Sequence, residues 1–330
     1  MSGESLIFMG SDPIALPALE AIRAGRCGPF SIDAVYTQPD RPKGRGKRIA
    51  ANQIKLWAKE NRIPVFQPGI MGKDERLEIQ AIAPTAIVVM AYGHLLSQKL
   101  IDVPMRGVWN LHTSLLPKYR GASPIQAAMV SGESETGVSL MEVVKKMDAG
   151  PILDKEKVRI KKEDTAIDLE KKLSSISAML VERNLEKIMS GEVSLVEQRE
   201  EEASYTRKLV KSDGVLDFSR PAVELACRIN GLYPWPAAKF EYEGAQIKVG
   251  LADFRDDEAL DGAPGQIVKV EEDGLQVHCG RGTLCLKRLQ RPGGKMMKAD
   301  EFLRGFQLQV GTQLPSFPMP PLVASEPNVF

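Results

Sequence analysis

Short, largely apolar segments alternate with helical stretches through the first half of the chain, and this alternation restricts the fold more than any other feature. Residues 6–9, 32–36 and 86–91 have the composition of strands, and a helix is expected over residues 16–22. Strands that are apolar on both faces suit a parallel sheet with helices on either side. We therefore expect an α/β fold with a Rossmann-like, mostly parallel sheet and helices on both faces.

The carboxyl ends of these strands form the expected ligand-binding edge, because ligands of such sheets bind beyond that end of the strands. The turn after the first expected strand, Gly10-Ser11-Asp12, lacks the Gly-x-Gly-x-x-Gly spacing of dinucleotide-binding loops, so a nicotinamide dinucleotide is not indicated. The loop that begins at Tyr92 and the loop that follows Trp109 both fall at this edge. The sequence therefore places a site for some other ligand there.

The second half of the chain has the pattern of a separate, smaller domain. At 330 residues, the chain exceeds the size at which a single core usually keeps growing. Residues 193–206 are polar and acidic and suit a linker, which places a domain boundary near residue 203. Short strand candidates follow between Gly and Asp turns, at residues 239–242, 246–249, 265–270, 275–279 and 283–289. We expect one domain with its linker over residues 1–203 and an OB-like β-barrel domain over residues 204–330.

Composition argues against several classes of protein. The four cysteines include no Cys-x-x-Cys pair, so reduced thiols are expected, and no apolar run approaches the roughly 18 residues of a membrane span. The amino terminus has no basic segment ahead of an apolar one, and a cytoplasmic protein is predicted. His278, Cys279 and Cys285 have unsuitable spacing for zinc, so no metal is expected. The net charge of +1 means that a nucleic acid would be bound by local basic clusters.

The segment from Asn110 to Asp148 contains the three group types that acyl transfer to an amine needs. Asn110 supplies an amide that can donate to a developing oxyanion, His112 an imidazole that can handle a proton, and Asp148 a carboxylate that can orient the imidazole. A core histidine flanked by turn residues is the alternative, and an isolated Asn-x-His would favour it. The surrounding runs, Ser-Leu-Leu-Pro-x-Tyr-Arg-Gly after His112 and Met-Asp-Ala-Gly around Asp148, favour an active site.

These motifs resemble those of the folate-dependent formyltransferases, which use an Asn, a His and an Asp at the same motif positions. The resemblance runs from residues 6–10 through residues 37–47 to residues 233–236 and into the second domain. It is greatest to the members of the family whose acceptor is methionyl initiator tRNA. The resemblance implies transfer of the formyl group of 10-formyltetrahydrofolate to the α-amine of methionyl initiator tRNA, for initiation of translation, with residues 1–203 as the catalytic domain.

The same resemblance assigns residues to the folate co-substrate. Residues 114–117 are expected to form the wall that faces the folate, and backbone groups after Met90 and at Val138 are expected to line the pterin pocket. The co-substrate residues are Ser114, Leu115, Leu116, Pro117, Tyr92, Gly93, Leu95 and Val138. His94 is a weak candidate, because a structural role suits it better than a catalytic one. For Tyr119, Arg120 and Gly121, ligand contact and a turn that holds the loop shape are both open.

Two basic regions are expected to bind tRNA. Residues 41–48 carry five cations and two glycines where the related tRNA enzymes have a basic recognition loop, and Arg45 is the strongest candidate; an ordinary solvated loop is the alternative. Basic residues of the second domain and the linker could follow tRNA phosphates. The expected tRNA residues are Arg41, Lys43, Arg45, Lys47, Arg48, Lys208, Arg281, Lys287 and Arg288, with Lys211, Arg291, Lys295 and Lys298 nearby.

Other functions share part of this pattern. A formyltransferase for a small amine, such as an amino sugar nucleotide or a purine precursor, would need Asn110, His112 and Asp148 but not both basic regions. A formyltetrahydrofolate hydrolase or dehydrogenase module would use water as the acceptor. A catalytically silent RNA-binding protein could keep the fold, although the three polar residues argue against it. A monomer is expected, because the enzyme must accommodate a large tRNA.

Overall fold

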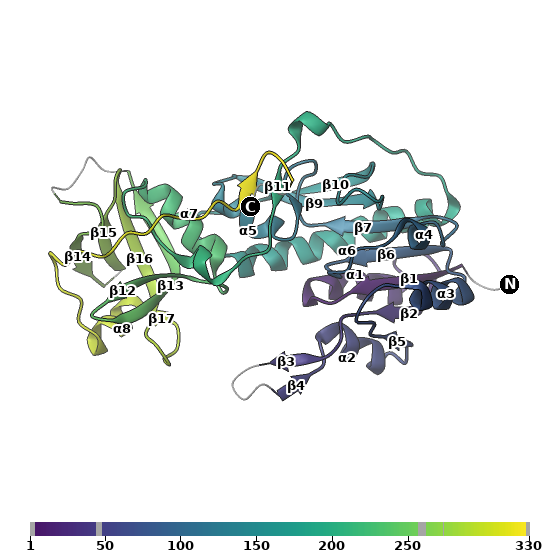
Figure 1. The fold of residues 1–330 in the computed structure, drawn as a ribbon, viewed down its shortest axis with the longest axis horizontal. Helices are drawn as coiled ribbons and strands as arrows, with labels where there is room; N and C mark the ends of the chain where they lie inside the picture. Colours follow the sequence, from purple (N-terminus) through teal and green to yellow (C-terminus); the bar gives the residue numbers. More distant parts are fainter. Residues whose placement is uncertain (1–3, 44–47, 257–261, 273, 328–330) are drawn as a thin grey trace. The chain divides into compact units, whose positions relative to one another are not determined.

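The computed structural model describes residues 4–43, 48–256, 262–272 and 274–327 (Figure 1). The chain divides into two compact units, each assembled from separate stretches of sequence. The first unit comprises Met1–Arg120, Gly137–Val158 and Glu170–Ala203, and the second comprises Gly121–Thr136, Arg159–Leu169 and Ser204–Phe330. Two short stretches that lie well before residue 204, residues 121–136 and 159–169, therefore group with the carboxyl-terminal part.

A seven-stranded sheet lies at the centre of the first unit within the described residues (Figure 1). Its strands are β1 (Ser5–Gly10), β2 (Ser31–Tyr36), β5 (Val65–Phe66), β6 (Ala86–Met90), β7 (Val108–His112), β9 (Glu135–Glu142) and β10 (Ile152–Arg159). The order is β10-β9-β7-β6-β1-β2-β5, in which β7 to β5 run parallel and β9 is antiparallel to β7. The expected mostly parallel α/β sheet is confirmed.

Both faces of this sheet are buried. Ile7 and Met9 of β1 pack with Ile79 and Leu100 on one face, and the alternate residues Leu6 and Phe8 point to the other face and are fully buried too. The helices of this unit are α1 (Leu16–Arg23), α2 (Gln53–Glu60), α3 (Lys73–Ile82), α4 (Gln98–Ile101) and α6 (Ala166–Ser190), with short 3-10 helices η1 (Pro13–Ala15) and η2 (Glu200–Glu202). Strands β3 (Arg41–Lys43) and β4 (Arg48–Ala50) pair as a separate antiparallel ribbon.

The register of the sheet brings three loops to one edge. Gly10 of β1 lies opposite Met90 of β6, and Val89 of β6 lies opposite Asn110 of β7. Beyond the strand ends, the Ser11 amide donates to the Ala91 carbonyl oxygen at 3.2 Å. The loops that follow β1, β6 and β7 therefore start at the same carboxyl edge, where the alternation of strands and helices predicts a site.

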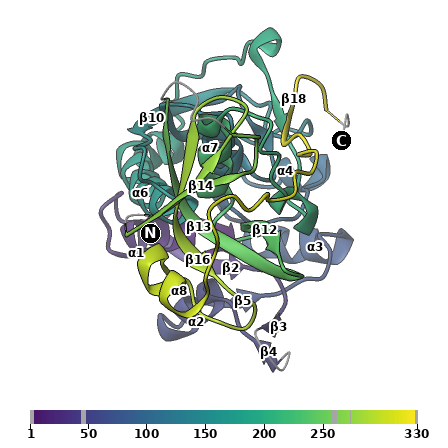
Figure 2. The same cartoon turned by 90° about the vertical axis from the view of Figure 1, so that its left-hand side faces the viewer.

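The second unit is built on an antiparallel sheet (Figure 2). Its strands are β12 (Ala238–Tyr242), β13 (Ala245–Arg255), β16 (Thr283–Gln290), β15 (Gly274–His278) and β14 (Ile267–Glu271) in that spatial order, with β17 (Met297–Lys298) on β16. Phe218, Ile229, Ile247 and Leu286 belong to its buried core, to which helices α7 (Ala222–Leu232) and α8 (Ala299–Gly305) contribute. The expected antiparallel β-rich second domain is confirmed.

Smaller elements complete the second unit. Helix α5 (Pro124–Val130) packs closely on α7, since a Cβ atom at Gly231 would lie 2.9 Å from the Met129 Cβ atom. Strands β8 (Arg120–Gly121), β11 (Tyr205–Thr206) and β18 (Val323–Ala324) form a small sheet, and η3 (Lys211–Gly214) follows β11. Among the described residues, no helix has the length and apolar content to cross a membrane.

A substitution at Gly137 in β9 would test how closely the strands next to the expected folate wall are packed. An added Cβ atom would lie 2.6 Å from Leu115 Cδ2 and closer still to the carbonyl oxygen of Glu156. Because that backbone atom cannot move away cheaply, we expect Gly137→Ala to destabilise the first unit by about 1–3 kcal/mol. Thermal unfolding followed by circular dichroism should show a clearly lower midpoint for this variant. Gly69→Ala is the control, because no atom lies within 4 Å of its added Cβ, and equal midpoints for the two variants would contradict the prediction.

Candidate active site

Strand β7 fixes the positions of Asn110 and His112. Their side chains lie two residues apart on an extended strand and therefore share one face of the sheet. Asn110 pairs with Val89 on one side and Met141 on the other, and His112 pairs with Ser139. With hydrogen-bonded strands on both sides, the strand offers a rigid base for the two side chains. His112 is buried, whereas Asn110 is partly exposed.

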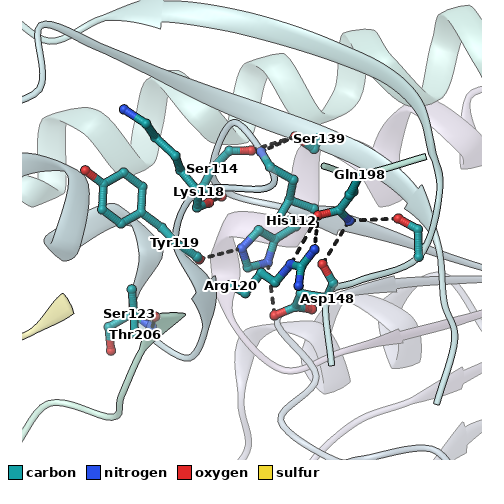
Figure 3. Close-up of polar contacts among 12 residues, drawn as sticks. His112, Ser114, Lys118, Tyr119, Arg120, Ser123, Ser139, Asp148, Gln198 and Thr206 are labelled. Atoms are coloured by element: carbon teal, nitrogen blue, oxygen red, sulfur yellow. Dashed lines mark hydrogen bonds and ion pairs between the residues drawn. The ribbon is translucent and has the colours of Figure 1, made fainter. Parts of the chain in front are cut away.

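The imidazole of His112 is held from both sides (Figure 3). Its Nε2 atom lies 3.0 Å from the carbonyl oxygen of Tyr119, and its Nδ1 atom lies 3.7 Å from Asp148 Oδ2. A carbonyl oxygen only accepts hydrogen bonds, so Nε2 carries a hydrogen in this contact. Nδ1 is therefore the ring nitrogen that faces the carboxylate and is available to exchange a proton. The structure thus brings together His112 and Asp148, which lie far apart in the sequence.

Asp148 lies in the loop that connects β9 to β10. The loop returns along β7, because the Val143 amide donates to the Val108 carbonyl oxygen at 2.7 Å while the Asp148 carboxylate reaches His112. Asp148 has a φ of +50°, a left-handed conformation that is unusual for a residue other than glycine. Gln198 Nε2 donates to the carbonyl oxygens of Asp148, at 2.9 Å, and Gly150, at 2.7 Å. Sequence analysis had placed Gln198 in a linker and had not identified it.

The Tyr119-Arg120-Gly121 segment has a clear structural role. Tyr119 has a φ of +63° and presents its carbonyl oxygen to His112. The Arg120 side chain is fully buried, and its Nη1 atom contacts both Glu200 carboxylate oxygens at 3.0 and 3.1 Å. Arg120 also donates to Gln198 Oε1 from Nε at 3.2 Å and from Nη2 at 2.9 Å. These contacts support the interpretation that the segment holds the shape of the loop.

The 114–117 segment is braced by the two strands beyond β7. Ser139 Oγ donates to the Ser114 carbonyl oxygen at 2.7 Å and accepts from the Leu116 amide at 3.0 Å. Lys155 Nζ donates to the Leu116 carbonyl oxygen at 2.5 Å, and burial lowers the pKa of this ammonium group. Ser114 Oγ donates to the Lys118 carbonyl oxygen at 2.6 Å, and the Leu116–Pro117 peptide is cis. Neither Ser139 nor Lys155 was identified from the sequence.

The loop after β6 is fastened through its backbone. The Tyr92 carbonyl oxygen accepts from Ser11 Oγ and Gln38 Nε2, each at 3.2 Å, and the Tyr92 hydroxyl donates to Met71 Sδ at 3.1 Å. Burial raises the pKa of the Tyr92 phenol, so the hydroxyl remains a neutral donor at physiological pH. Leu95 is 80% exposed, whereas Val138 is fully buried. Of these two residues, Leu95 is the one that can offer its side chain to a ligand, whereas Val138 has no exposed surface in the structure.

His94 follows Gly93 in this loop, and a metal site is the other possibility to consider. The buried His94 Nε2 atom has no hydrogen-bond partner among the described residues, and the His94 ring meets the Tyr92 ring edge-on, with centroids 5.1 Å apart. Within the described part of the chain, no group of three or more His, Cys, Asp or Glu side chains is arranged to hold a metal ion.

The expected tRNA loop is described only in part. Arg41 is exposed at the start of β3, and its Nη2 atom donates to Gln38 Oε1 at 2.8 Å. Lys43 is the last residue of β3 and Arg48 is the first residue of β4, and the two are paired in the backbone register of the ribbon. Arg45 and Lys47 lie outside the described residues.

The expected tRNA residues of the second unit lie mainly on and around β16. Arg288 pairs with Lys298 of β17 in the register of the sheet, and the Arg288 guanidinium lies 6.0 Å from the centre of the Tyr233 ring. Like charges in directly opposed positions destabilise a sheet unless a counter-charge is present. Lys287 already has a counter-charge, since its Nζ atom lies 3.4 Å from Asp253 Oδ2. Arg281 and Lys208 are both exposed.

Comparison with known proteins places these features in a family. Residues 6–184 match the family described as formyl transferase, and residues 208–307 match formyl transferase, C-terminal domain. A methionyl-tRNA formyltransferase of Geobacter sulfurreducens is 36% identical to the chain, over 95% of the chain and 98% of the relative. A methionyl-tRNA formyltransferase of Ectopseudomonas mendocina is 40% identical, over 88% of the chain and 91% of the relative.

Solved structures show the same fold. An N-formyltransferase from Helicobacter canadensis, in complex with folinic acid and dTDP-3-aminofucose, has a TM-score of 0.66 at 18% identity, over 88% of this chain and 100% of that chain. HypX from Aquifex aeolicus, in complex with tetrahydrofolic acid, has a TM-score of 0.60 at 15% identity, over 94% of this chain and 48% of that chain. From its matches to both domains and from these full-length relatives, we conclude that the chain belongs to the formyl transferase family.

Proposed function

We propose that this enzyme transfers the formyl group of 10-formyltetrahydrofolate to the α-amine of methionyl initiator tRNA. The observation that carries the proposal is the cluster of Asn110, His112 and Asp148 at the carboxyl edge of the sheet, with His112 Nδ1 3.7 Å from Asp148 Oδ2. The two relatives described above bear the name of this activity and match the chain over most of its length. The product, a formylated initiator tRNA, serves the initiation of translation, which supports a cytoplasmic location.

The chemistry follows from the charges that develop during transfer. The amine attacks the formyl carbon, the new carbon–nitrogen bond forms, the bond from that carbon to N10 breaks, and one proton moves from the amine to N10. Negative charge develops on the formyl oxygen, and the Asn110 amide, on the same face of β7 as His112, would donate to it. His112 shares this face of β7 with Asn110 and would present Nδ1 to the same oxygen, while Nε2 stays on the Tyr119 carbonyl oxygen. The Asp148 carboxylate accepts the proton that leaves the amine, and this proton then passes to N10 as the bond from the formyl carbon to N10 breaks.

Two segments would hold the folate co-substrate. Residues Ser114, Leu115, Leu116 and Pro117 form one wall, and Tyr92, Gly93, Leu95 and Val138 supply the other, mostly through backbone groups. A pterin presents donors and acceptors around a flat ring, and backbone amides in a fixed loop read such a pattern well. The contacts of Ser139 and Lys155 support this assignment, because they fix the 114–117 wall before the ligand binds.

The acceptor tRNA would be bound by both domains. We assign residues 1–203 to the catalytic domain with its linker and residues 204–330 to the tRNA-binding β-barrel domain. The facing Arg288 and Lys298 support this assignment, since phosphate would relieve their mutual repulsion. The remaining tRNA residues of the proposal are Arg41, Lys43, Arg45, Lys47, Arg48, Lys208, Arg281 and Lys287. A monomer would leave these surfaces free for a large substrate.

The decisive experiment offers labelled 10-formyltetrahydrofolate with four acceptors in parallel. These are methionyl-tRNA, free methionine, an amino sugar nucleotide and water. Label in methionyl-tRNA alone is the expected result. Label on a small amine would retain the active-site chemistry and reject the tRNA acceptor, and an absence of transfer to all four acceptors would reject the proposal.

We expect Asp148→Asn to lower kcat by about 10²–10⁴-fold, because the amide cannot take the proton that leaves the amine. The side chain keeps its size, so the fold and both KM values should change little. Rapid-quench measurement of formyl transfer checks this expectation. The matched control is Asp102→Asn, which makes the same chemical change at an exposed residue whose side chain contacts Gln98. A kcat for Asp148→Asn close to that of the control would show that the carboxylate is not needed.

We expect Arg288→Ala to raise KM for methionyl-tRNA while KM for 10-formyltetrahydrofolate stays unchanged. Loss of one phosphate contact should reduce the salt dependence of tRNA binding by about one unit in the slope of log K against log salt. Filter binding at several salt concentrations measures this slope. The control is Arg304→Ala, since Arg304 is exposed and lies 3.7 Å from Asp300. Equal slopes for the two variants would remove Arg288 from the tRNA site.

A further inference from the structure

The segment between α6 and η2 is attached to the first unit by backbone hydrogen bonds. The Ile152 amide donates to the Val196 carbonyl oxygen at 2.8 Å, and the Val196 amide donates to the Ile152 carbonyl oxygen at 2.9 Å. Ile152 begins β10, so this pair fixes the chain two residues before Gln198 to the edge of the sheet. The segment that has the composition of a linker therefore runs beside the loop that carries Asp148.

Every hydrogen-bonding position of the Gln198 side-chain amide is occupied. Its two N–H groups serve the carbonyl oxygens of Asp148 and Gly150, and its oxygen accepts from two nitrogens of Arg120 (Figure 3). A side-chain amide has two donors and two acceptor positions, and all four are matched. A glutamate of the same size would keep the Arg120 contacts but would have no hydrogen to give to the two carbonyl oxygens. The arrangement therefore requires an amide.

Asp148 depends on such an anchor. Its left-handed backbone conformation is unfavourable for an L-residue and persists where the surroundings impose it. The two carbonyl oxygens that Gln198 binds belong to Asp148 itself and to Gly150, so they flank the turn on which the carboxylate is mounted. A change in this backbone would swing the carboxylate, which is only 3.7 Å from His112 Nδ1.

Arg120 links this anchor to the histidine. Its buried guanidinium contacts Gln198 of the segment and Glu200 of η2, and the preceding residue, Tyr119, presents its carbonyl oxygen to His112 Nε2. Two successive residues thus fix both partners: Tyr119 fixes the imidazole directly, and Arg120 fixes the carboxylate through Gln198. The separation of His112 and Asp148 is therefore set within one hydrogen-bonded frame.

We propose that Gln198 is a positioning residue, which holds the backbone of the Asp148 turn and thereby aims the carboxylate at His112. The kinetic part of this inference rests on the proposed function, in which Asp148 receives the proton that leaves the amine. The Gln198 amide is fully engaged with protein groups and would act through Asp148. Its loss should therefore lower kcat and leave both KM values nearly unchanged.

The kinetic test compares Gln198→Ala and Gln198→Glu with Gln98→Ala, a matched control at an exposed glutamine whose amide donates to Asp102. We expect both Gln198 variants to lose roughly tenfold to hundredfold in kcat, the range expected for a misplaced catalytic group, with KM values within about twofold. Thermal unfolding identifies variants that fail to fold, and Gln198→Glu, which keeps its size and its Arg120 contacts, carries the test if Gln198→Ala is unfolded. Unchanged kcat, or an effect confined to KM, would overturn the proposal.

A double-mutant cycle separates positioning from general damage. If Gln198 acts through Asp148, adding Gln198→Ala to Asp148→Asn should lower kcat by less than about twofold further. An undiminished effect in the Asp148→Asn background would show that Gln198 acts independently of the carboxylate and would overturn the proposal.

Nuclear magnetic resonance gives a readout that does not need activity. The chain has three histidines, so the ring signals of His112 can be assigned by substitution. We expect these signals to shift in both Gln198 variants and to stay in place in Gln98→Ala. This result would stand even if methionyl-tRNA proved not to be the acceptor, which distinguishes failure of the proposed function from failure of the positioning role. Unshifted His112 signals in the Gln198 variants would overturn the proposal.

Discussion

The fully buried guanidinium of Arg120 is the constraint on which the geometry of the site depends. A buried charge is costly unless it is paired and hydrogen-bonded, because the protein interior solvates it poorly. Glu200 supplies a counter-charge and Gln198 supplies a further acceptor, so the segment after α6 stays close to the Tyr119–Gly121 turn. Gln198 also binds the carbonyl oxygens of Asp148 and Gly150, so the need to pair the Arg120 charge also holds the Asp148 turn in place.

The sheet was predictable because each strand can be identified from the apolar composition of its own few residues. Residues 6–9, 32–36 and 86–91 are largely apolar, and they became β1, β2 and β6. Asn110 and His112 could be placed together because a separation of two residues on a strand fixes a common face. Asp148 was chosen through its surrounding motif, since no local periodicity predicts that a loop after β9 returns along β7. Its proximity to His112 could be seen only in the folded chain.

The parts that sequence analysis missed share one physical cause. Gln198 stands in a polar, acidic stretch, and such a stretch has the composition of a solvated linker whether or not it is hydrogen-bonded. Ser139 and Lys155 act on the 114–117 segment across neighbouring strands, so their roles depend on register. The pairing of Arg288 with Lys298 also depends on register. Each of these roles is a contact between distant parts of the chain, which composition and periodicity do not encode.

The contact between His112 Nε2 and the Tyr119 carbonyl oxygen has a consequence for the direction of proton flow. Many histidines pass a proton across the ring, accepting it on one nitrogen and releasing the other from the opposite side. Here Nε2 is engaged with a backbone oxygen that can take no proton at physiological pH, so a proton that joins the ring at Nδ1 must also leave from Nδ1. In the proposed reaction His112 therefore cannot conduct a proton across its ring, and net movement from the amine to N10 would run along the Asp148 side of the ring.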